Sequence, residues 1–368
     1  MRILLTGANG FIGKNLFVRL QELKKLQVST FGRGDAIINL PNLVQESDIV
    51  IHLAGENRPA KASDFVVGNT ELTEKICAAI GGARRPIPFI VASSVQSTED
   101  TPYGKSKRNA EIIVEKFCKD TNNPTVMYRL PGVFGKWCKP NYNSVVATFC
   151  HNIAHNLPIR IDNYDSDLRL VYIDDVIDEI INAIESLKPG FQWGVISPQY
   201  KIKLGELAEK IQAFHNSRKS LLTEKVGDGF LRALYSTYIS YLSPQDFKYE
   251  VPSYSDERGV FIEMLKTPTY GQFSCFTVIP GVTRGSHYHH TKTEKFLVLQ
   301  GLALMKFRNL ATGEVYEINL SSERFEIVDS IPGWVHDITN IGQEKVIVML
   351  WANEIFDKNK PDCIPCLV

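Results

Sequence analysis

The chain has 368 residues, of which 44% are hydrophobic and 22% charged, a composition typical of globular proteins rather than disordered or fibrous ones. Its 41 basic and 41 acidic side chains balance, which gives no support to a nucleic-acid partner or an anionic membrane surface. No apolar run approaches the roughly 20 residues that span a bilayer, so we expect no membrane insertion. A strand predicted to begin at Arg2 leaves no room for a cleavable secretory signal.

The seven cysteines are odd in number and scattered along the chain. This pattern favours reduced thiols in a cytoplasmic protein over a disulfide framework. Cys363 and Cys366 have the CxxC form, but no second pair accompanies them to complete a tetrahedral metal site. We therefore expect no redox or metal role for this pair.

In chain order, the first two thirds of the sequence alternates short apolar runs with amphipathic segments. The predicted strands are Ile3–Leu5, Val28–Phe31, Ile49–Leu53, Ile87–Val91 and Val126–Leu130. The predicted helices are Lys14–Lys25, Thr70–Ala79, Tyr103–Lys119, Asp174–Leu187 and Leu204–Asn216. Such alternation predicts right-handed βαβ units and a parallel, Rossmann-like α/β sheet, which we assign to a domain of residues 1–242.

From about Phe247 onward the pattern changes to short strands at hairpin spacing, punctuated by glycine and proline. The predicted strands are Phe261–Leu265, Phe273–Val278, Lys295–Leu299 and Val346–Trp351. Without convincing long helices, this segment indicates a second, all-β domain over residues 247–368, either a sandwich or a barrel. Because exposed edge strands of barrels can pair, we expect a homodimer or a higher homo-oligomer.

A glycine-rich turn, Thr6–Gly13, follows the first strand and opens the first helix with the spacing GxxGxxG. Glycines permit a tight turn and a close approach of the backbone, and the helix N-terminus faces the pyrophosphate of a dinucleotide. A glycine triplet alone is explained by a tight turn, but its place in the first βαβ unit favours cofactor binding. The candidate cofactor-binding residues of this turn are Gly7, Asn9, Gly10, Phe11, Ile12 and Gly13.

The end of the second strand bears on which dinucleotide binds. An acidic residue there accepts hydrogen bonds from a free ribose 2′-hydroxyl, whereas a guanidinium suits a 2′-phosphate. Arg33 comes before Asp35 in this sequence, which favours NADPH over NADH. The alternative is that Arg33 is a solvated turn residue and that Asp35 binds the ribose.

Tyr103 and Lys107 are four residues apart, so on a helix they lie on one face, one turn from each other. A phenol becomes a useful acid near neutral pH when a nearby ammonium and the nicotinium charge lower its pKa. Ser94, at a strand end, is placed to hydrogen-bond a substrate carbonyl. A YxxxK pair is common by chance as an exposed helix pair, but after a nucleotide-binding turn it favours catalysis.

Over residues 1–242 these features resemble the extended short-chain dehydrogenase/reductases that act on nucleotide sugars. The resemblance rests on Thr6–Gly13, His52–Gly55, Asn69, Ser94, Tyr103, Lys107, Arg129–Gly135 and Arg169–Val176. It implies that Leu53, Ala54 and Pro131 join Lys107 in binding the cofactor, and that Arg169–Val176 lines the sugar-nucleotide lobe. Only nine positions separate Ser94 from Tyr103, fewer than is usual in this family, so Ser97 is an alternative for the serine role.

A second candidate site lies in the C-terminal domain. His287 and His289 project to the same face of one strand, Glu294 begins the next strand, and His336 comes from a later segment. Two or three imidazoles with a carboxylate and an open position suit Zn²⁺ or another divalent transition metal. The alternative is an exposed polar hairpin, since His287, His289 and His290 are close together in the chain.

Residues 247–368 are similar to the cupin family, because the pattern G-x5-H-x-H-x4-E-x6-G is matched from Gly281 to Gly301. The resemblance implies an all-β cupin barrel that binds a metal, although its second motif around His336 is one residue shorter than usual. Arg284–His287 and Asp256–Phe261 also resemble metal-free deoxysugar 3,5-epimerases. His287 is therefore a candidate ligand or a candidate base. His287 and His290 are the catalytic candidates, although the sequence leaves open which of His287, His289 and His290 moves the proton.

Both domains suit one substrate. A 4-keto-6-deoxy sugar has acidic C–H bonds beside its carbonyl, so a barrel with a metal and a histidine could invert a neighbouring carbon before NADPH reduces the ketone. The domain order resembles that of bifunctional capsular polysaccharide synthesis enzymes. This resemblance implies C3 epimerisation of UDP-2-acetamido-2,6-dideoxy-4-hexulose, followed by reduction at C4. The product is the UDP-N-acetyl-L-talosamine-type precursor of UDP-N-acetyl-L-fucosamine.

Two other functions stay open. The N-terminal domain could be a nucleotide-sugar epimerase or dehydratase that recycles bound NAD⁺, with the barrel as a structural module; such an enzyme consumes no net NADPH. The chain could also be a non-enzymatic sensor of redox state and sugar. The set of Ser94, Tyr103 and Lys107 argues against a sensor, which has no use for a proton donor.

Overall fold

The computed structural model describes residues 1–251, 253–256, 259–262, 265, 271–354 and 359–368. Its contacts group into two compact units, each discontinuous in sequence. Unit 1 is Met1–Ser144 with Leu168–Lys201, and unit 2 is Val145–Asp167 with Ile202–Val368. The division of the sequence at residues 242–247 stays a prediction of where the β domain begins.

Unit 1 is built on a six-stranded parallel sheet with the order β2-β1-β3-β4-β5-β8. The strands are β1 (Arg2–Thr6), β2 (Gln27–Phe31), β3 (Ile49–His52), β4 (Phe89–Ser94), β5 (Thr125–Leu130) and β8 (Phe191–Gly194). Along the chain, β2 is added on one side of β1 and β3 on the other, so the strand order reverses at β1. Open α/β sheets bind ligands at such a point, beside the carboxyl ends of the strands, here those of β1 and β3. The predicted Rossmann-like parallel sheet is confirmed.

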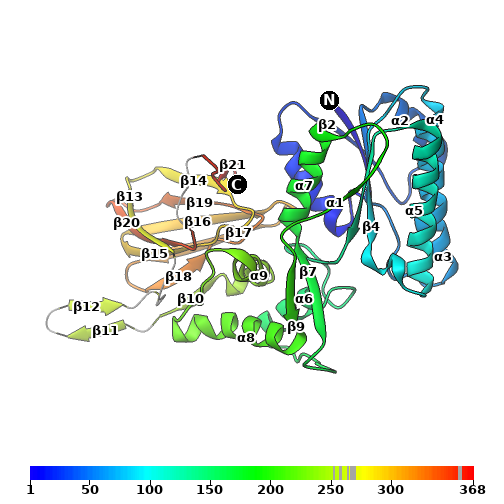
Figure 1. Cartoon of the computed structure of the whole chain (residues 1–368). Coiled ribbons are helices and arrows are strands. Elements are labelled where there is room, and N and C mark those ends of the chain that lie inside the picture. Colours follow the sequence, from blue (N-terminus) through cyan, green and yellow to red (C-terminus); the bar gives the residue numbers. More distant parts are fainter. Residues whose placement is uncertain (252, 257–258, 263–264, 266–270, 355–358) are drawn as a thin grey trace. The chain divides into compact units, whose positions relative to one another are not determined.

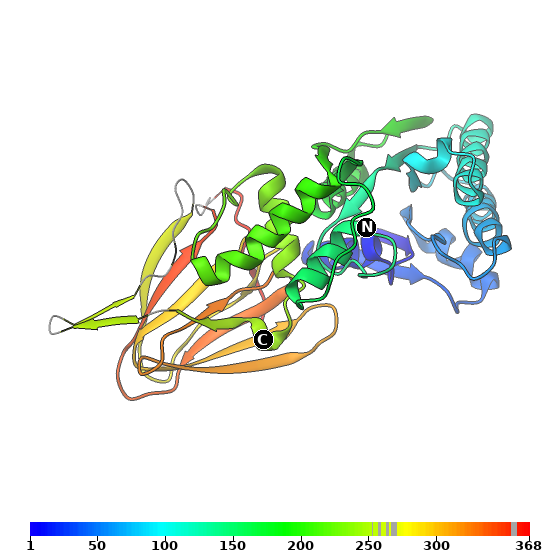
Figure 2. The ribbon, with the colours of Figure 1, turned by 90° about the horizontal axis from the view of Figure 1, so that it is seen from below.

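Helices cover both faces of this sheet (Figures 1 and 2). On one face α1 (Phe11–Glu22) packs against α7 (Ile173–Ser186). The other face carries α2 (Leu40–Glu46), α4 (Leu72–Gly82) and α5 (Pro102–Thr121). The short α3 (Ser63–Phe65) and a π-helical turn (Val66–Glu71) lead into α4.

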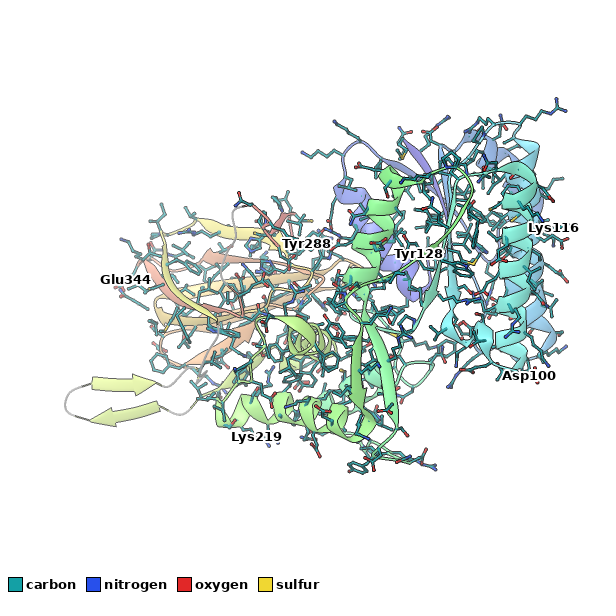
Figure 3. All side chains as sticks on the ribbon, in the orientation of Figure 1. Asp100, Lys116, Tyr128, Lys219, Tyr288 and Glu344 are labelled. Atoms are coloured by element: carbon teal, nitrogen blue, oxygen red, sulfur yellow. The ribbon has the colours of Figure 1, made fainter. Side chains whose placement is uncertain are left out.

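The helix α5, which carries the Tyr103–Lys107 pair, has strong local signals at both ends. Thr101 caps its start by accepting a hydrogen bond from the Gly104 N–H at 3.0 Å, and a proline occupies the first turn. Asn122 ends it in the left-handed conformation, with φ of 53°. Lys116 extends into solvent from its outer face (Figure 3), while Val114 is buried against the sheet. These signals explain why the spacing of apolar residues predicts this helix well.

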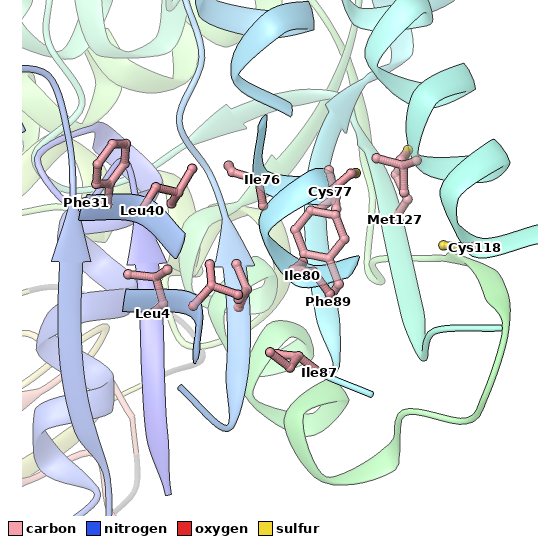
Figure 4. Close-up of a cluster of buried hydrophobic side chains, with 14 residues drawn as sticks. Leu4, Phe31, Leu40, Ile76, Cys77, Ile80, Ile87, Phe89, Cys118 and Met127 are labelled. Carbon is pink, nitrogen blue, oxygen red and sulfur yellow. The ribbon is translucent and has the colours of Figure 1, made fainter. Parts of the chain in front are cut away.

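A hydrophobic core between the sheet and α2, α4 and α5 holds the strand ends in place (Figure 4). Ile76 and Ile80 of α4, one turn apart, are fully buried or nearly so together with Leu4, Phe89 and Met127 of the strands. Each such side chain contributes roughly 1.5–3 kcal/mol by leaving water. The loops that follow β1, β3 and β4 therefore start from rigid positions.

Unit 2 combines helices with two five-stranded antiparallel sheets, of order β10-β18-β15-β20-β13 and β17-β16-β19-β14-β21. Their strands are β10 (Lys248–Glu250), β13 (Gln272–Val278), β14 (Thr283–Tyr288), β15 (Glu294–Gln300), β16 (Leu302–Asn309), β17 (Val315–Ser321), β18 (Glu326–Asp329), β19 (Trp334–Asn340), β20 (Val346–Ala352) and β21 (Ile364–Pro365). The helices are α6 (Val145–Ala154), α8 (Leu204–Ser220) and α9 (Gly229–Ile239). The predicted all-β architecture of the C-terminal part is confirmed.

Two smaller sheets complete the strands that the structure describes. β11 (Ser253–Asp256) pairs with β12 (Gly259–Ile262), and β6 (Gly132–Phe134), β7 (Asp167–Tyr172) and β9 (Tyr200–Lys203) form a three-stranded sheet. The strand predicted at 261–265 thus corresponds to β12, and residues 263 and 264 lie outside the described residues. Of the Asp256–Phe261 segment, Glu257 and Arg258 also lie outside them. Short 3₁₀ turns occur at Ile37–Asn39, Val95–Thr98 and Pro244–Asp246.

Among the residues described, no helix combines the length and apolar character that a membrane span requires. None of the seven cysteines, all of which lie among the described residues, forms a disulfide. This agrees with the prediction that the chain holds no disulfide framework.

Candidate active site and candidate metal centre

The glycine-rich turn between β1 and α1 packs directly on the end of β3. Gly7 has φ of +74°, and a Cβ there would lie 2.6 Å from the Ala54 nitrogen. A Cβ on Gly13 would lie 2.0 Å from the Gly7 carbonyl oxygen. Gly10 is the N-cap of α1 and has no side chain that could cap the first N–H groups of the helix. This end of α1 suits a pyrophosphate, as the sequence predicts.

His52 at the end of β3 has a structural place beneath this turn. Its buried imidazole lies between the hydroxyls of Thr6 at 2.7 Å and Thr73 at 3.0 Å. Burial, aided by the nearby charge of Lys107, lowers its pKa to about 3, so the ring is neutral. The Thr6 hydroxyl also accepts from the Ala54 N–H at 3.3 Å. The Leu53–Ala54 backbone predicted to bind cofactor is thereby held beside Gly7.

Arg33 follows β2 and forms an ion pair with Glu56, which follows β3. Its side chain is 85% exposed, so the guanidinium is accessible to a ligand. The Asp35 carboxylate instead accepts the Gly32 N–H at 2.8 Å and closes the turn. Of the two residues that are candidates for binding the ribose, Asp35 is therefore hydrogen-bonded within its own turn, and Arg33 is exposed.

Ser94, Tyr103 and Lys107 lie near one another at the end of β4 and the start of α5. The Ser94 and Tyr103 side chains are hydrogen-bonded, and burial raises the pKa of Tyr103 above its usual value. The Lys107 ammonium lies 3.4 Å from the Ala92 carbonyl oxygen, and burial lowers its pKa to about 8. Ser97 is buried in the following 3₁₀ turn. The hydrogen bond to Tyr103 therefore favours Ser94 for the serine role.

Asn69 ties the loop after β3 to the start of α5. Its amide donates to the Ser106 hydroxyl at 2.9 Å, and that hydroxyl donates to the Tyr103 carbonyl at 2.7 Å. Its oxygen accepts the Glu56 N–H at 2.9 Å. A Cβ on Gly55 would lie 2.7 Å from the Asn69 Oδ1 and 3.1 Å from the Lys107 Nζ, so the lysine sits against this loop.

Sequence reasoning missed Glu111, one helical turn after Lys107. Its buried carboxylate accepts from Arg129 Nε at 3.0 Å, from Arg129 Nη2 at 2.7 Å and from the Ser93 hydroxyl at 2.6 Å. Its negative charge also opposes the fall in the pKa of Lys107 that burial causes. The i,i+4 spacing of Lys107 and Glu111 was the only sequence signal for this role.

The Arg129–Gly135 segment continues from β5 into β6 through the buried Pro131. Just beyond it, the buried Lys136 ammonium bonds both carboxylate oxygens of Asp174 at 2.8 and 3.0 Å. Asn15 of α1 donates to the Lys136 carbonyl at 3.3 Å. These contacts fix the start of α7 and give Asp174 a structural partner.

In unit 2, His287, His289, Glu294 and His336 come together from β14, the loop after it, β15 and β19. One ligand atom from each lies within 4.8 Å of those of the others. The Glu294 Oε2 is 3.2 Å from His289 Nε2 and 3.5 Å from His336 Nε2. Burial lowers the pKa of His287 to about 4, with help from the neighbouring His336 and His289, so its ring is a neutral potential ligand.

The donor set fits a divalent cation on two observations. His289 Nδ1 bonds the backbone carbonyl of Asp362, which only accepts, so Nδ1 carries the proton and the Nε2 lone pair faces Glu294. This lone pair and the Glu294 carboxylate lie 3.2 Å apart, so a cation bound between them would satisfy both acceptors. The second observation is the buried His336, whose Nε2 lies 3.5 Å from the same Glu294 Oε2 and therefore faces the same point as His289 Nε2.

His290 is the one predicted histidine outside this group of four. Its buried ring lies 5.5 Å from that of Tyr288 in an edge-on arrangement, whereas the rings of His287 and His289 lie 4.9 Å from each other. His290 is not part of the group formed by His287, His289, Glu294 and His336. Its catalytic role stays a prediction.

Two family profiles match the chain. Residues 3–196 match the NAD dependent epimerase/dehydratase family, and residues 254–364 match the polysaccharide biosynthesis C-terminal domain. The chain is 51% identical over 368 residues to the UDP-2-acetamido-2,6-beta-L-arabino-hexul-4-ose reductase of Pseudomonas aeruginosa, a match that covers 100% of this chain and 99% of that protein.

Among solved structures, the capsular polysaccharide assembling protein CapF from Staphylococcus aureus matches with a TM-score of 0.67 and 37% identity, over 100% of both chains. This similarity confirms the resemblance that the order of the two domains predicted. A UDP-glucuronic acid 4-epimerase from Bacillus cereus, 20% identical over 58% of this chain and 83% of its own, has a TM-score of 0.52 and shares the fold.

Proposed function

We propose, from the premise that this chain belongs to the NAD dependent epimerase/dehydratase family, that it is a bifunctional enzyme of nucleotide-sugar synthesis. Its substrate is a UDP-linked 4-keto-6-deoxy amino sugar. The domain of residues 247–368 inverts C3, and the domain of residues 1–242 then reduces the C4 ketone to the UDP-N-acetyl-L-talosamine-type precursor of UDP-N-acetyl-L-fucosamine. The name of the P. aeruginosa relative, a reductase of a UDP-linked hexul-4-ose, supports this substrate class.

The observation that carries the reductase role is the hydrogen bond of Ser94 to Tyr103, beside the partly buried Lys107. NADPH supplies a hydride when bound. The Tyr103 phenol protonates the developing alkoxide, the Ser94 hydroxyl orients the ketone oxygen, and the Lys107 ammonium stabilises the phenolate left behind. The test is stoichiometry: the protein should consume one NADPH for each ketosugar reduced. An enzyme that recycles bound NAD⁺ would consume none.

The charge of Lys107 predicts how activity depends on pH. Burial sets the pKa of Lys107 near 8 and raises that of Tyr103, so the lysine is the first of the two to titrate as the pH rises. Below that pH the ammonium is present; above it the phenolate loses its stabilising charge. We expect kcat to fall above about pH 8. Arginine keeps its charge at high pH, so the activity that Lys107→Arg retains should not fall above about pH 8. The same fall of kcat in this variant would show that deprotonation of Lys107 does not cause it.

Cofactor preference depends on Arg33 in this proposal. The exposed guanidinium pairs with the 2′-phosphate of NADPH, while Asp35 stays in its turn. Removing a charge-assisted hydrogen bond costs about 1.5–3 kcal/mol, so Arg33→Ala should raise the KM for NADPH roughly 10- to 100-fold. The KM for NADH should change little. Equal losses with both cofactors in steady-state assays would show that Arg33 does not read the phosphate.

The epimerase role rests on the group of His287, His289, Glu294 and His336. We propose that the two sheets form a cupin barrel in which these residues hold Zn²⁺ or another divalent transition metal. The metal supplies positive charge to the ketone oxygen when the C3 proton leaves. His287 is half-buried whereas the other three are buried, and it stays a candidate for ligand or base. Homodimer formation and the cytoplasmic location remain predictions.

A further inference from the structure

Asp362, near the C-terminus of the chain, lies against the loop that carries His289. This loop, residues 289–293, joins β14 to β15 and is buried throughout. The Asp362 carboxylate accepts hydrogen bonds from the N–H groups of His290, Thr291 and Lys292, at 2.8, 2.7 and 2.7 Å, and from the Thr291 hydroxyl at 3.1 Å. Buried N–H groups left without partners are costly, so this one carboxylate satisfies a large part of the loop.

Several other backbone groups of the loop have partners of their own. Ser236 of α9 donates to the Thr291 carbonyl at 2.5 Å, and the Gly333 N–H donates to the His289 carbonyl at 3.0 Å. Asn353 accepts the Thr293 N–H at 2.9 Å. Asp362 therefore supplies the only carboxylate that binds the backbone N–H groups of His290, Thr291 and Lys292 among the described residues.

Asp362 acts on His289 by a second route. Its backbone carbonyl accepts from His289 Nδ1, which fixes the tautomer that turns Nε2 toward Glu294. The side chain of the same residue anchors the loop that holds this histidine, so the carbonyl and the imidazole move together. Partners of this kind orient metal ligands and raise their affinity for the metal.

We propose that Asp362 is a positioning residue that holds His289 ready to bind the metal, an inference that rests on the metal site proposed above. It touches neither substrate nor metal. Its carboxylate anchors the loop and its carbonyl orients the imidazole, so the two together set the affinity of the site. The neighbouring sequence gives no hint of this role, because Asp362 is 73 residues beyond His289.

The test uses the full-length protein, stripped with a chelator and reconstituted with Co²⁺. We expect Asp362→Asn to bind Co²⁺ about 10- to 100-fold more weakly in competition with a chromophoric chelator, and to change the visible d–d spectrum. Glu317→Gln, which removes an exposed carboxylate from β17, is the matched control and should bind like the wild type. Circular dichroism reports whether each variant is folded.

A folded Asp362→Asn variant with wild-type affinity and spectrum would overturn the inference. If this variant does not fold, Thr291→Val decides, because it removes the hydroxyl that bonds Asp362 and Arg232 but leaves the backbone contacts to Asp362, and it should weaken binding by a smaller factor. Unchanged affinity in Thr291→Val would then overturn the inference. A wild-type protein that fails to bind Co²⁺ would instead contradict the proposed metal site itself.

Discussion

Tyr103→Phe should lower the kcat for NADPH oxidation by roughly 10²- to 10⁴-fold, the contribution typical of a positioned general acid. The substitution removes the proton that the phenol gives to the C4 alkoxide and leaves the aromatic ring, which lies 5.8 Å from that of Phe65, in place. The KM for NADPH should change little, because the glycine-rich turn that we propose binds the cofactor is untouched. The measurement is the initial rate of absorbance loss at saturating NADPH and UDP-ketosugar.

Tyr316→Phe is the matched control for this loss. Tyr316 lies on β17 of unit 2, where its ring contacts Phe247, and the change removes the same single hydroxyl. Its rate should equal that of the wild type. A Tyr103→Phe enzyme that keeps more than a tenth of the wild-type rate would show that another group is the acid.

Glu294→Gln should abolish epimerisation and spare reduction. The substitution keeps the shape of the side chain but removes the negative charge that faces His289 and His336, so the site should lose most of its bound metal. Because a metal contributes several kcal/mol to stabilising the enolate, exchange of the C3 proton should slow at least about a hundredfold. Metal content is measured by mass spectrometry and exchange by proton NMR in deuterated water.

The reductase step serves as an internal control for Glu294→Gln. Supplied with ketosugar that is already epimerised at C3, the variant should oxidise NADPH at the wild-type rate, since Tyr103 and Lys107 belong to unit 1. Undiminished C3 exchange after metal loss would remove the metal from the mechanism. In that case His287 or His290 would have to act without one.

The sequence predicts β1, β3, β4 and β5 of unit 1 because these strands are rich in buried apolar residues, but it misses the edge strand β8. It predicts α5 because the capping residues and the spacing of apolar residues indicate the same helix. α9 escaped prediction, since its sequence is rich in aromatic residues and Asp228 at its N-cap makes no capping hydrogen bond with its side chain. The residues of α9 that are buried depend on packing within unit 2, so the spacing of apolar residues along the sequence does not predict this helix.

The same distinction holds for the candidate sites. The predicted ligands His287, His289, Glu294 and His336 do come together, but the expectation that His287 and His289 share one strand is wrong, because β14 ends at Tyr288 and His289 lies in the loop after it. Glu111 and Asp362 act through partners 18 and 70 or more residues away, so their roles depend on the folded chain. His290 lies beside His289 in the loop after β14, where its ring packs near that of Tyr288, and strand alternation does not apply to this loop.

Heavy water offers the most direct check that one polypeptide performs both reactions on one ketosugar. The wild-type enzyme is incubated with the UDP-4-ketosugar in D₂O, first alone and then with NADPH, and the product is analysed by mass spectrometry and NMR. We predict deuterium at C3 before NADPH is added, and a reduced product that retains this label and has the inverted C3 configuration. Two results would contradict the claim that one polypeptide performs both reactions: a reduced product without deuterium at C3, or a ketosugar that carries deuterium at C3 but is not reduced after NADPH is added.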